Sequence, residues 1–257
     1  MKGGYADCRF GQLHYVQRVT EHGPGTPLVL LNPRSRSCRR MVSYLPTAQA
    51  VVVPDLPGLG NSSPLPDGAG MDDVAGAVVD LLDALGIASA YVYGIHTGNK
   101  VAAALAAHWP DRVRGLLLCG KSHSIVPDQE RRNAAMKDQA DRPDSLVVRF
   151  EGKYLDDTEG PQAMARLYLA NFAFDLADAV RACQAPLRVI EITSPAEDAA
   201  YGRHGAELAA LAPRGDCLEL PQVDATGLDM YTGAAVMAEA VTQFINAKAT
   251  PSWRESA

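Results

Sequence analysis

The 257-residue chain lacks the sequence features of several large protein classes. No apolar run reaches the length of a membrane-spanning helix, and the first residues, MKGGYADCRFGQLHYVQ, contain no apolar segment typical of a signal peptide. There is no excess of basic residues, because the formal charge is −6 and charges of both signs are mixed along the chain. We therefore expect a cytoplasmic protein that binds neither a membrane nor a nucleic acid.

Motifs for metals and cofactors are also absent. There is no H-E-x-x-H pattern, no G-x-G-x-x-G that opens a helix, and YGIHTGNK lacks the spacing of a phosphate-binding loop. The five cysteines are scattered, odd in number and without CxxC spacing, which is typical of reduced thiols: they are Cys8, Cys38, Cys119, Cys183 and Cys217. We expect no cofactor and no metal.

The chain does contain an alternation of strand and helix patterns, which is typical of a parallel sheet covered by helices on both faces. Apolar or alternating runs predict strands at 13–19, 27–32, 50–55, 90–94, 114–120, 186–194 and 215–221. Helix patterns cover 71–87, 97–110 and 234–247.

The middle of the chain has a different composition. Residues 121–185 are richer in charge and in long aromatic side chains, and we interpret them as helices inserted into the sheet order. The sequence thus predicts a core made of residues 1–120 and 186–257, and a helical cap or lid made of residues 121–185.

The stretch YVYGIHTGN, residues 91–99, has the pattern of a strand, a tight turn and the start of a helix. A sharp strand-to-helix turn strains the backbone of its central residue and needs small residues two positions to either side. Gly94 and Gly98 supply them around His96. Histidine is among the residues enriched at positive φ, and the N-terminus of the following helix favours negative charge. The sequence therefore predicts an imidazole at the tip of this turn.

Four motifs, in this order, resemble the α/β-hydrolase superfamily and within it the cap-bearing esterases and C–C hydrolases. LLNPRSRS (30–37) corresponds to the turn after the third strand, DLPGLGNS (55–62) to the D-x-P-G-x-G-x-S signature, GIHTG (94–98) to the nucleophile elbow, and AAHWPDRVRGLLL (106–118) to the next helix and strand. The resemblance implies an α/β-hydrolase fold, in which a mostly parallel, doubly wound sheet carries an inserted helical lid. It also implies hydrolysis of an ester or a C–C bond as the commonest activity.

Two members of the family's catalytic triad are missing at their expected places. The elbow holds His96 where the family has a serine, cysteine or aspartate nucleophile. The segment LPQVDATGLDMYT (220–232) has Ala225 where the family has its histidine. Since the acyl-enzyme mechanism needs a hydroxyl or thiol together with a base, we do not transfer that mechanism to this chain.

The oxyanion turn is altered as well. It reads Asn32-Pro33, and Pro33 has no N–H to donate. The backbone N–H groups of Arg34 and Thr97 can still form an oxyanion hole in altered form.

We interpret His96 as a general acid–base residue acting on water or on a substrate proton. The resemblance places the family's acid at Asp198, with Glu197 as the alternative, and Asp224 or Asp229 can also reach the imidazole. A carboxylate bonded to one ring nitrogen would fix the tautomer and leave the other nitrogen facing the pocket. Covalent catalysis by the imidazole is chemically open too, and so is the reading of His96 as a relic in a site that only binds.

Further polar residues border the predicted pocket. Arg34 and Arg36 can grip a carboxylate or phosphate, or can belong to a solvated basic turn. His123 follows the strand at 114–120, at the edge that faces the ligand crevice in open α/β sheets, and a loop histidine without a role is the alternative. Cys119, at the same strand end, can be a nucleophile or a small buried residue.

Two hypotheses about function remain open on the sequence. The first is a cofactor-independent enzyme that acts on a small organic ester, carbonyl compound or carboxylate-bearing substrate as a hydrolase, lyase or cyclase, with His96 as acid–base residue. The second is a non-catalytic ligand-binding or partner protein on the same scaffold. The expected partner is a small molecule, an anionic one under the arginine hypothesis, and a homo-oligomer is compatible with the sequence.

Overall fold

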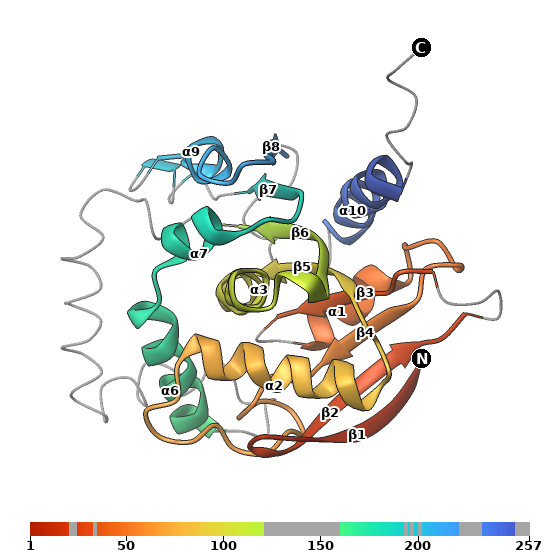
Figure 1. Cartoon of the computed structure of the whole chain (residues 1–257), viewed down its shortest axis with the longest axis vertical. Helices are drawn as coiled ribbons and strands as arrows, with labels where there is room; N and C mark the ends of the chain where they lie inside the picture. Colours follow the sequence, from red (N-terminus) through yellow and green to blue (C-terminus); the bar gives the residue numbers. More distant parts are fainter. Residues whose placement is uncertain are drawn as a thin grey trace.

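The structure is a computed structural model, and it describes residues 1–20, 25–32, 35–120, 160–192, 195, 198–199, 202–220 and 233–249. In this part of the chain, eight strands form one sheet in the order β1-β2-β4-β3-β5-β6-β7-β8 (Figure 1). The strands are β1 (Lys2–Cys8), β2 (Gly11–Arg18), β3 (Leu28–Leu31), β4 (Val51–Pro54), β5 (Ala90–Ile95), β6 (Val113–Cys119), β7 (Leu187–Glu191) and β8 (Gly215–Glu219). β1 and β2 are antiparallel to their neighbours, and the other six strands are mutually parallel.

Helices cover both faces of the sheet (Figure 1). One face packs against α2 (Met71–Ala84), α3 (Thr97–His108), α6 (Gly160–Ala173), α7 (Leu176–Ala182) and α9 (Gly205–Ala209). The other face packs against α1 (Ser35–Val42) and α10 (Ala234–Ala249), and a short 3-10 turn, η1 (Pro110–Arg112), precedes β6. Among the described helices, none combines the length and the apolar character needed to cross a bilayer.

The apolar strand runs of the sequence follow from this two-sided burial. All four residues of β3 are buried, with Val29 and Leu31 in the core on one face and Leu28 and Leu30 in the core on the other. Because successive side chains of a strand point to opposite faces, a strand between two helical layers has to be apolar at every position. The predicted fold, a mostly parallel doubly wound sheet, is confirmed.

One strand was missed by the sequence patterns. β1 has the sequence KGGYADC, with two glycines and two charged residues, and it lies at the edge of the sheet, paired with β2 alone among the described strands. An edge strand that is largely exposed needs no apolar run, so the pattern used for the central strands does not find it. Helix α2 begins at the predicted residue and ends three residues before the predicted limit, next to Gly86, whose φ of 67° suits glycine.

The predicted lid falls largely outside the described residues. Of the segment 121–185, the structure describes residues 160–185, which contain α6 and α7 as the expected helices. The limits of the lid therefore stay a prediction.

The carboxyl ends of the parallel strands meet at one edge of the sheet. β3 is followed by Asn32, β4 by Asp55, β5 by His96 and β6 by Gly120. Ligands bind at this edge in open α/β sheets, so the topology gathers the predicted site residues where a crevice is expected.

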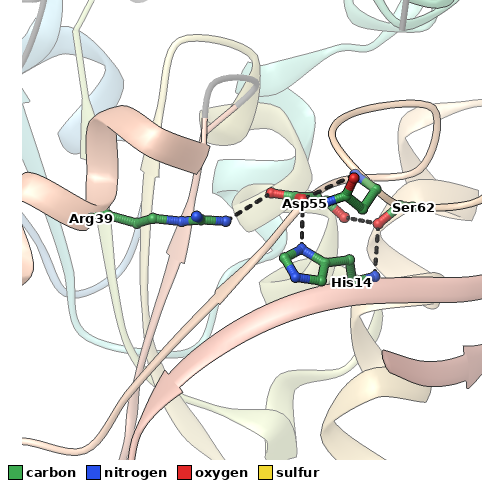
Figure 2. A network of polar contacts seen from close by, with 5 residues as sticks. His14, Arg39, Asp55 and Ser62 are labelled. Carbon is green, nitrogen blue, oxygen red and sulfur yellow. Dashed lines mark hydrogen bonds and ion pairs between the residues drawn. The ribbon is translucent and has the colours of Figure 1, made fainter. Parts of the chain in front are cut away.

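The motif DLPGLGNS closes around its own aspartate at this edge (Figure 2). Asp55 is 3% exposed, its Oδ2 lies 2.7 Å from His14 Nδ1, and it accepts a hydrogen bond from the Asn61 backbone N–H at 3.1 Å. Arg39 Nη2 lies 3.6 Å from the other carboxylate oxygen. The Ser62 hydroxyl donates to the Asp55 carbonyl at 2.6 Å and accepts the His14 N–H at 3.0 Å. The network ties β2, β4, α1 and the turn together.

The Asp55 network predicts a large stability difference between two carboxylates. Replacing Asp55 by alanine removes a buried carboxylate and leaves the groups that donate to it without an acceptor. We therefore expect the free energy of unfolding to fall by roughly 3 kcal/mol or more. The control is Asp83→Ala, because the Asp83 side chain is 63% exposed in its 2.8 Å pair with Arg112 and should contribute less than about 1 kcal/mol. Urea denaturation of both variants measures the difference, and equal losses would contradict the role of the network.

Candidate active site

The turn at His96 has the strained geometry that the sequence predicts. His96 has φ 53° and ψ −125°, and in the described part of the chain it is the one non-glycine residue with positive φ. A side chain at Gly98 would overlap the Leu31 carbonyl at the end of β3, and one at Gly94 would overlap the Gly98 carbonyl and lie 2.9 Å from the Ala102 Cβ. The two glycines therefore allow α3 to begin directly against β3 and β5, and this packing forces the turn.

The His96 side chain is exposed at the tip of this turn. Its Nδ1 would lie 4.0 Å from a Cβ placed on Gly120, which follows β6 and has φ 91°. The imidazole thus extends sideways, over the carboxyl end of the neighbouring strand, instead of packing into the interior. A titratable ring that is open to solvent and close to a strand end can reach a bound molecule and exchange protons with it.

Asn99 fixes the end of β6 to the first turn of α3. Its amide donates to the Cys119 carbonyl at 2.7 Å and accepts the Cys119 N–H at 2.8 Å, and it is 4% exposed. Because Asn99 follows His96 by three residues and Gly120 follows Cys119, this reciprocal pair sets the separation between the imidazole and the strand end. Burial raises the pKa of the Cys119 thiol to about 12, so the thiolate that a nucleophile needs is not formed at neutral pH.

Two residues of the predicted oxyanion site, Thr97 and Asn32, are described and buried. Thr97 is the first residue of α3 and is 4% exposed, and the first N–H groups of a helix have no partner within it. Asn32 is 3% exposed and its side chain bonds the Cys38 thiol, whose pKa burial raises to about 12. Arg34 lies outside the described residues, so its N–H as a member of the oxyanion hole stays a prediction.

The predicted acid Asp198 lies in the segment after β7. Its carboxylate oxygen Oδ2 accepts from Arg203 Nη2 at 2.9 Å and from Nε at 3.2 Å, and its side chain is one-third exposed. The ion pair ties Asp198 to Arg203 in the same segment of the chain, and the choice of Asp198 as partner of His96 stays a prediction.

Other predicted site residues lie outside the described part of the chain. These are Asp224, Asp229, Glu197 and His123. Arg36 is in α1, but its side chain belongs to the same undescribed set. Within the described residues, no group of three His, Cys, Asp or Glu side chains is arranged to hold a metal ion.

A buried carboxylate that sequence reasoning missed supports the segment around Asp198. Glu191 ends β7 at 2% exposure and accepts a hydrogen bond from the Gly205 backbone N–H. Burial raises the pKa of Glu191, and the backbone N–H of Gly205, the charge of Arg203 and the backbone N–H of His204 offset part of this effect. Its signal in the sequence was a single glutamate inside the apolar strand PLRVIEITS. Glu191 therefore anchors residues 203–205, from which Arg203 reaches Asp198.

A cavity of about 610 Å³ opens at the opposite edge of the sheet. Its walls come from the amino ends of the strands, including Pro27 before β3, Ala50 before β4 and Ser89 before β5. Since His96 follows the carboxyl end of β5, the length of the strand separates this cavity from the elbow, and it is not the crevice of the candidate site.

The raised pKa of Glu191 predicts a pH dependence of stability. Because the pKa in the folded state lies above the ordinary 4.5, the folded state binds more protons between the two values, and the free energy of unfolding falls as pH rises through this window. Glu191→Gln keeps an oxygen for the Gly205 N–H without the charge, so its unfolding free energy should fall less over the same window.

Urea denaturation between pH 4 and pH 8 measures this dependence. The exposed Glu239 provides the control Glu239→Gln, which should follow the wild-type curve. A Glu191→Gln curve parallel to the wild type would contradict the role assigned to the buried charge.

Solved structures share the fold over almost the whole chain. The enol-lactonase from Burkholderia xenovorans LB400 superimposes with a TM-score of 0.70 at 23% identity, covering 95% of this chain and 100% of that chain. A hydrolase from Pseudomonas aeruginosa PA01 gives a TM-score of 0.71 at 22% identity, covering 95% and 98%. At this level of identity, the likeness establishes the fold alone.

Similarity in sequence is confined to segments. The 2-hydroxymuconate semialdehyde hydrolase of Pseudomonas sp. (strain CF600) is 31% identical over 121 residues, which are 44% of this chain and 43% of that protein. The dihydrolipoyllysine-residue acetyltransferase component of the acetoin cleaving system of Cupriavidus necator is 43% identical over 74 residues, or 29% and 20%. The matches thus span less than half the length of these relatives.

Residues 23–151 match the family described as the alpha/beta hydrolase fold, and the chain belongs to that family.

Proposed function

We propose that the protein is a cofactor-independent enzyme in which His96 acts as general acid–base residue in the hydrolysis of a small organic ester or carbonyl compound. The observation that carries this proposal is the placement of His96: a strained turn holds its imidazole exposed at the carboxyl edge of the sheet, beside Gly120. Strained conformations persist only where the surrounding structure enforces them, and they cluster at functional sites.

The proposed reaction uses water as the nucleophile. The neutral imidazole takes a proton from a water molecule while the water oxygen bonds to the substrate carbonyl carbon, which gives a tetrahedral intermediate and an imidazolium ion. In this proposal, the N–H groups at the start of α3, at Thr97, stabilise the negative charge that develops on the carbonyl oxygen. The imidazolium then returns the proton to the leaving alkoxide as the carbon–oxygen bond breaks, so His96 ends neutral.

An acyl-enzyme route has less support at this site. The elbow offers an imidazole in place of a hydroxyl, and the nearby Cys119 thiol has a pKa raised to about 12 by burial. In the proposed reaction, Asp198 or Asp224 accepts a hydrogen bond from one ring nitrogen and thereby fixes the tautomer. The lyase and cyclase reactions that we also expect from the sequence would use the same imidazole on a substrate proton.

The similar proteins agree with hydrolysis of this kind. The 2-hydroxymuconate semialdehyde hydrolase shares a segment of 121 residues with this chain, and the enol-lactonase shares its fold. We propose further that residues 121–185 form the lid over the site and that Arg34 and Arg36 bind an acidic group of the substrate. Arginine recognises carboxylates in a bidentate fashion, which makes a carboxylate-bearing ester the preferred substrate class.

Substitution of His96 tests the proposed role. In a panel of p-nitrophenyl esters, His96→Ala and His96→Ser should lower kcat/KM by about 100-fold or more, because general acid–base catalysis contributes on the order of 10² to 10⁴. The acid limb of the wild-type pH profile should disappear in His96→Gln. The control is His108→Ala, since His108 is an exposed residue at the far end of the same helix and its variant should keep wild-type rates.

The outcomes separate the two hypotheses about function. Turnover that survives in both His96→Ala and His96→Ser would overturn the catalytic role. A wild-type protein that binds the esters without turning them over would favour the ligand-binding alternative. A fluorophosphonate probe should not label the protein, because no serine occupies the elbow.

Neutral and anionic substrates test the arginine proposal. We expect mono-p-nitrophenyl succinate to be preferred over p-nitrophenyl butyrate, and Arg34→Gln together with Arg36→Gln should reduce that preference about tenfold, the effect of one lost charge-assisted contact. Arg40 is the matched control, because it lies in the same basic segment and its side chain is exposed. An equal loss of activity toward both esters would show that these arginines do not recognise the negative charge of the substrate.

A further inference from the structure

Lys100 is a buried lysine that the proposed reaction does not use. It is 4% exposed and lies in the first turn of α3, four residues after His96. Lysine is rarely buried without a partner, and a cation near a helix N-terminus is disfavoured by the helix dipole. Its position therefore depends on compensating contacts with another element.

Two contacts that compensate the buried charge come from α6. Lys100 Nζ donates to the Asn171 carbonyl at 2.6 Å and lies 5.8 Å from the centre of the Phe172 ring. Asn171 is 6% exposed and belongs to the last turn of α6, where the final carbonyls lack partners within the helix and carry the negative end of its dipole. The ammonium group and the end of α6 are thus matched in charge and in hydrogen bonding, away from water.

A second polar contact of α6, at its solvent-exposed side, is of a different kind. Arg166 Nε lies 2.6 Å from Asp67 Oδ1, but these side chains are 41% and 83% exposed. Exposed ion pairs contribute little, whereas a buried charge-assisted hydrogen bond is strong and leaves an unsatisfied group when it is lost. Leu167 and Ala170 of α6 pack in the hydrophobic core, but apolar contacts are non-directional and do not fix the position of the helix end.

We propose that Lys100 is a positioning residue that holds the C-terminal end of α6 in a fixed position on the elbow helix. Moving the end of α6 away from α3 would separate the ammonium group from the Asn171 carbonyl in a dry environment, so α6 and the elbow move as one unit. The inference rests on the proposed function only in taking His96 as the site. Lys100 acts through α6 and does not touch the substrate.

Hydrogen exchange tests this role without any substrate. Lys100→Met keeps the length of the side chain and removes the hydrogen-bond donor. In this variant, amide exchange in peptides covering α6 at 160–173 should become about tenfold faster or more. Exchange in peptides covering α2 at 71–84 should change by less than about twofold. The matched control is Arg166→Gln, which removes the exposed contact of the same helix and should change α6 exchange by less than about threefold. Lys100→Arg retains a cation and a donor and should stay closer to the wild type than Lys100→Met.

Two results would overturn the proposal: α6 exchange in Lys100→Met at the wild-type rate, or equal acceleration in α6 and α2, which indicates a general loss of stability. Where Lys100→Met does not fold, Lys100→Gln is compared in the same way. Since exchange is measured without turnover, a failure of the His96 proposal leaves this test intact. Where the wild type turns over an ester, Lys100→Met should change KM more than kcat, whereas His96→Ala should lower kcat.

Discussion

The close approach of the elbow to β3 is the constraint on which the candidate site depends. No side chain fits at Gly98 beneath the Leu31 carbonyl or at Gly94 beneath the Gly98 carbonyl. Because both positions are glycine, α3 starts in contact with the sheet, and the residue between them takes φ 53°. The reciprocal Asn99–Cys119 pair then fixes the next strand to the same helix turn. These contacts together place an imidazole at the crevice edge of the sheet.

The sequence predicted the parts of the fold that have a local signal, and it missed those that depend on contacts across space. Burial on both faces requires an apolar run in each central strand, and steric crowding requires two glycines in the elbow. The sequence patterns therefore predicted both the central strands and the elbow. β1 lies at an exposed edge, where no such pressure acts. Glu191 and Lys100 are single polar residues within apolar patterns. Their structural roles depend on hydrogen-bond partners that are 14 and 71 residues away in the sequence. No periodicity encodes such pairs.

Two buried carboxylates at the sheet edge, Asp55 and Glu191, have a structural role: each holds a neighbouring segment in place. The exposed imidazole of His96 differs from them in this respect. Asp55 holds the turn of DLPGLGNS, in which Gly60 leaves room for the carboxylate, and Glu191 holds residues 203–205. Asp55 has several hydrogen-bond partners, and burial raises the pKa of Glu191. Both carboxylates are buried and accept hydrogen bonds from backbone N–H groups, so they serve as anchors of these segments. The exposed His96 has the opposite properties, which suit proton transfer.

Under the proposed function, an imidazole at the elbow changes what the scaffold can do, because it puts the base at the position where an attacking hydroxyl otherwise stands. A water molecule must then fit between the ring and the carbonyl carbon, so the substrate has to bind farther from the turn than in an acyl-transfer site. The space above the elbow thus becomes part of the mechanism. In the proposed arrangement Lys100, four residues after His96, holds the end of α6 through a charge-assisted hydrogen bond, so a helix of the proposed lid keeps a fixed position relative to the base.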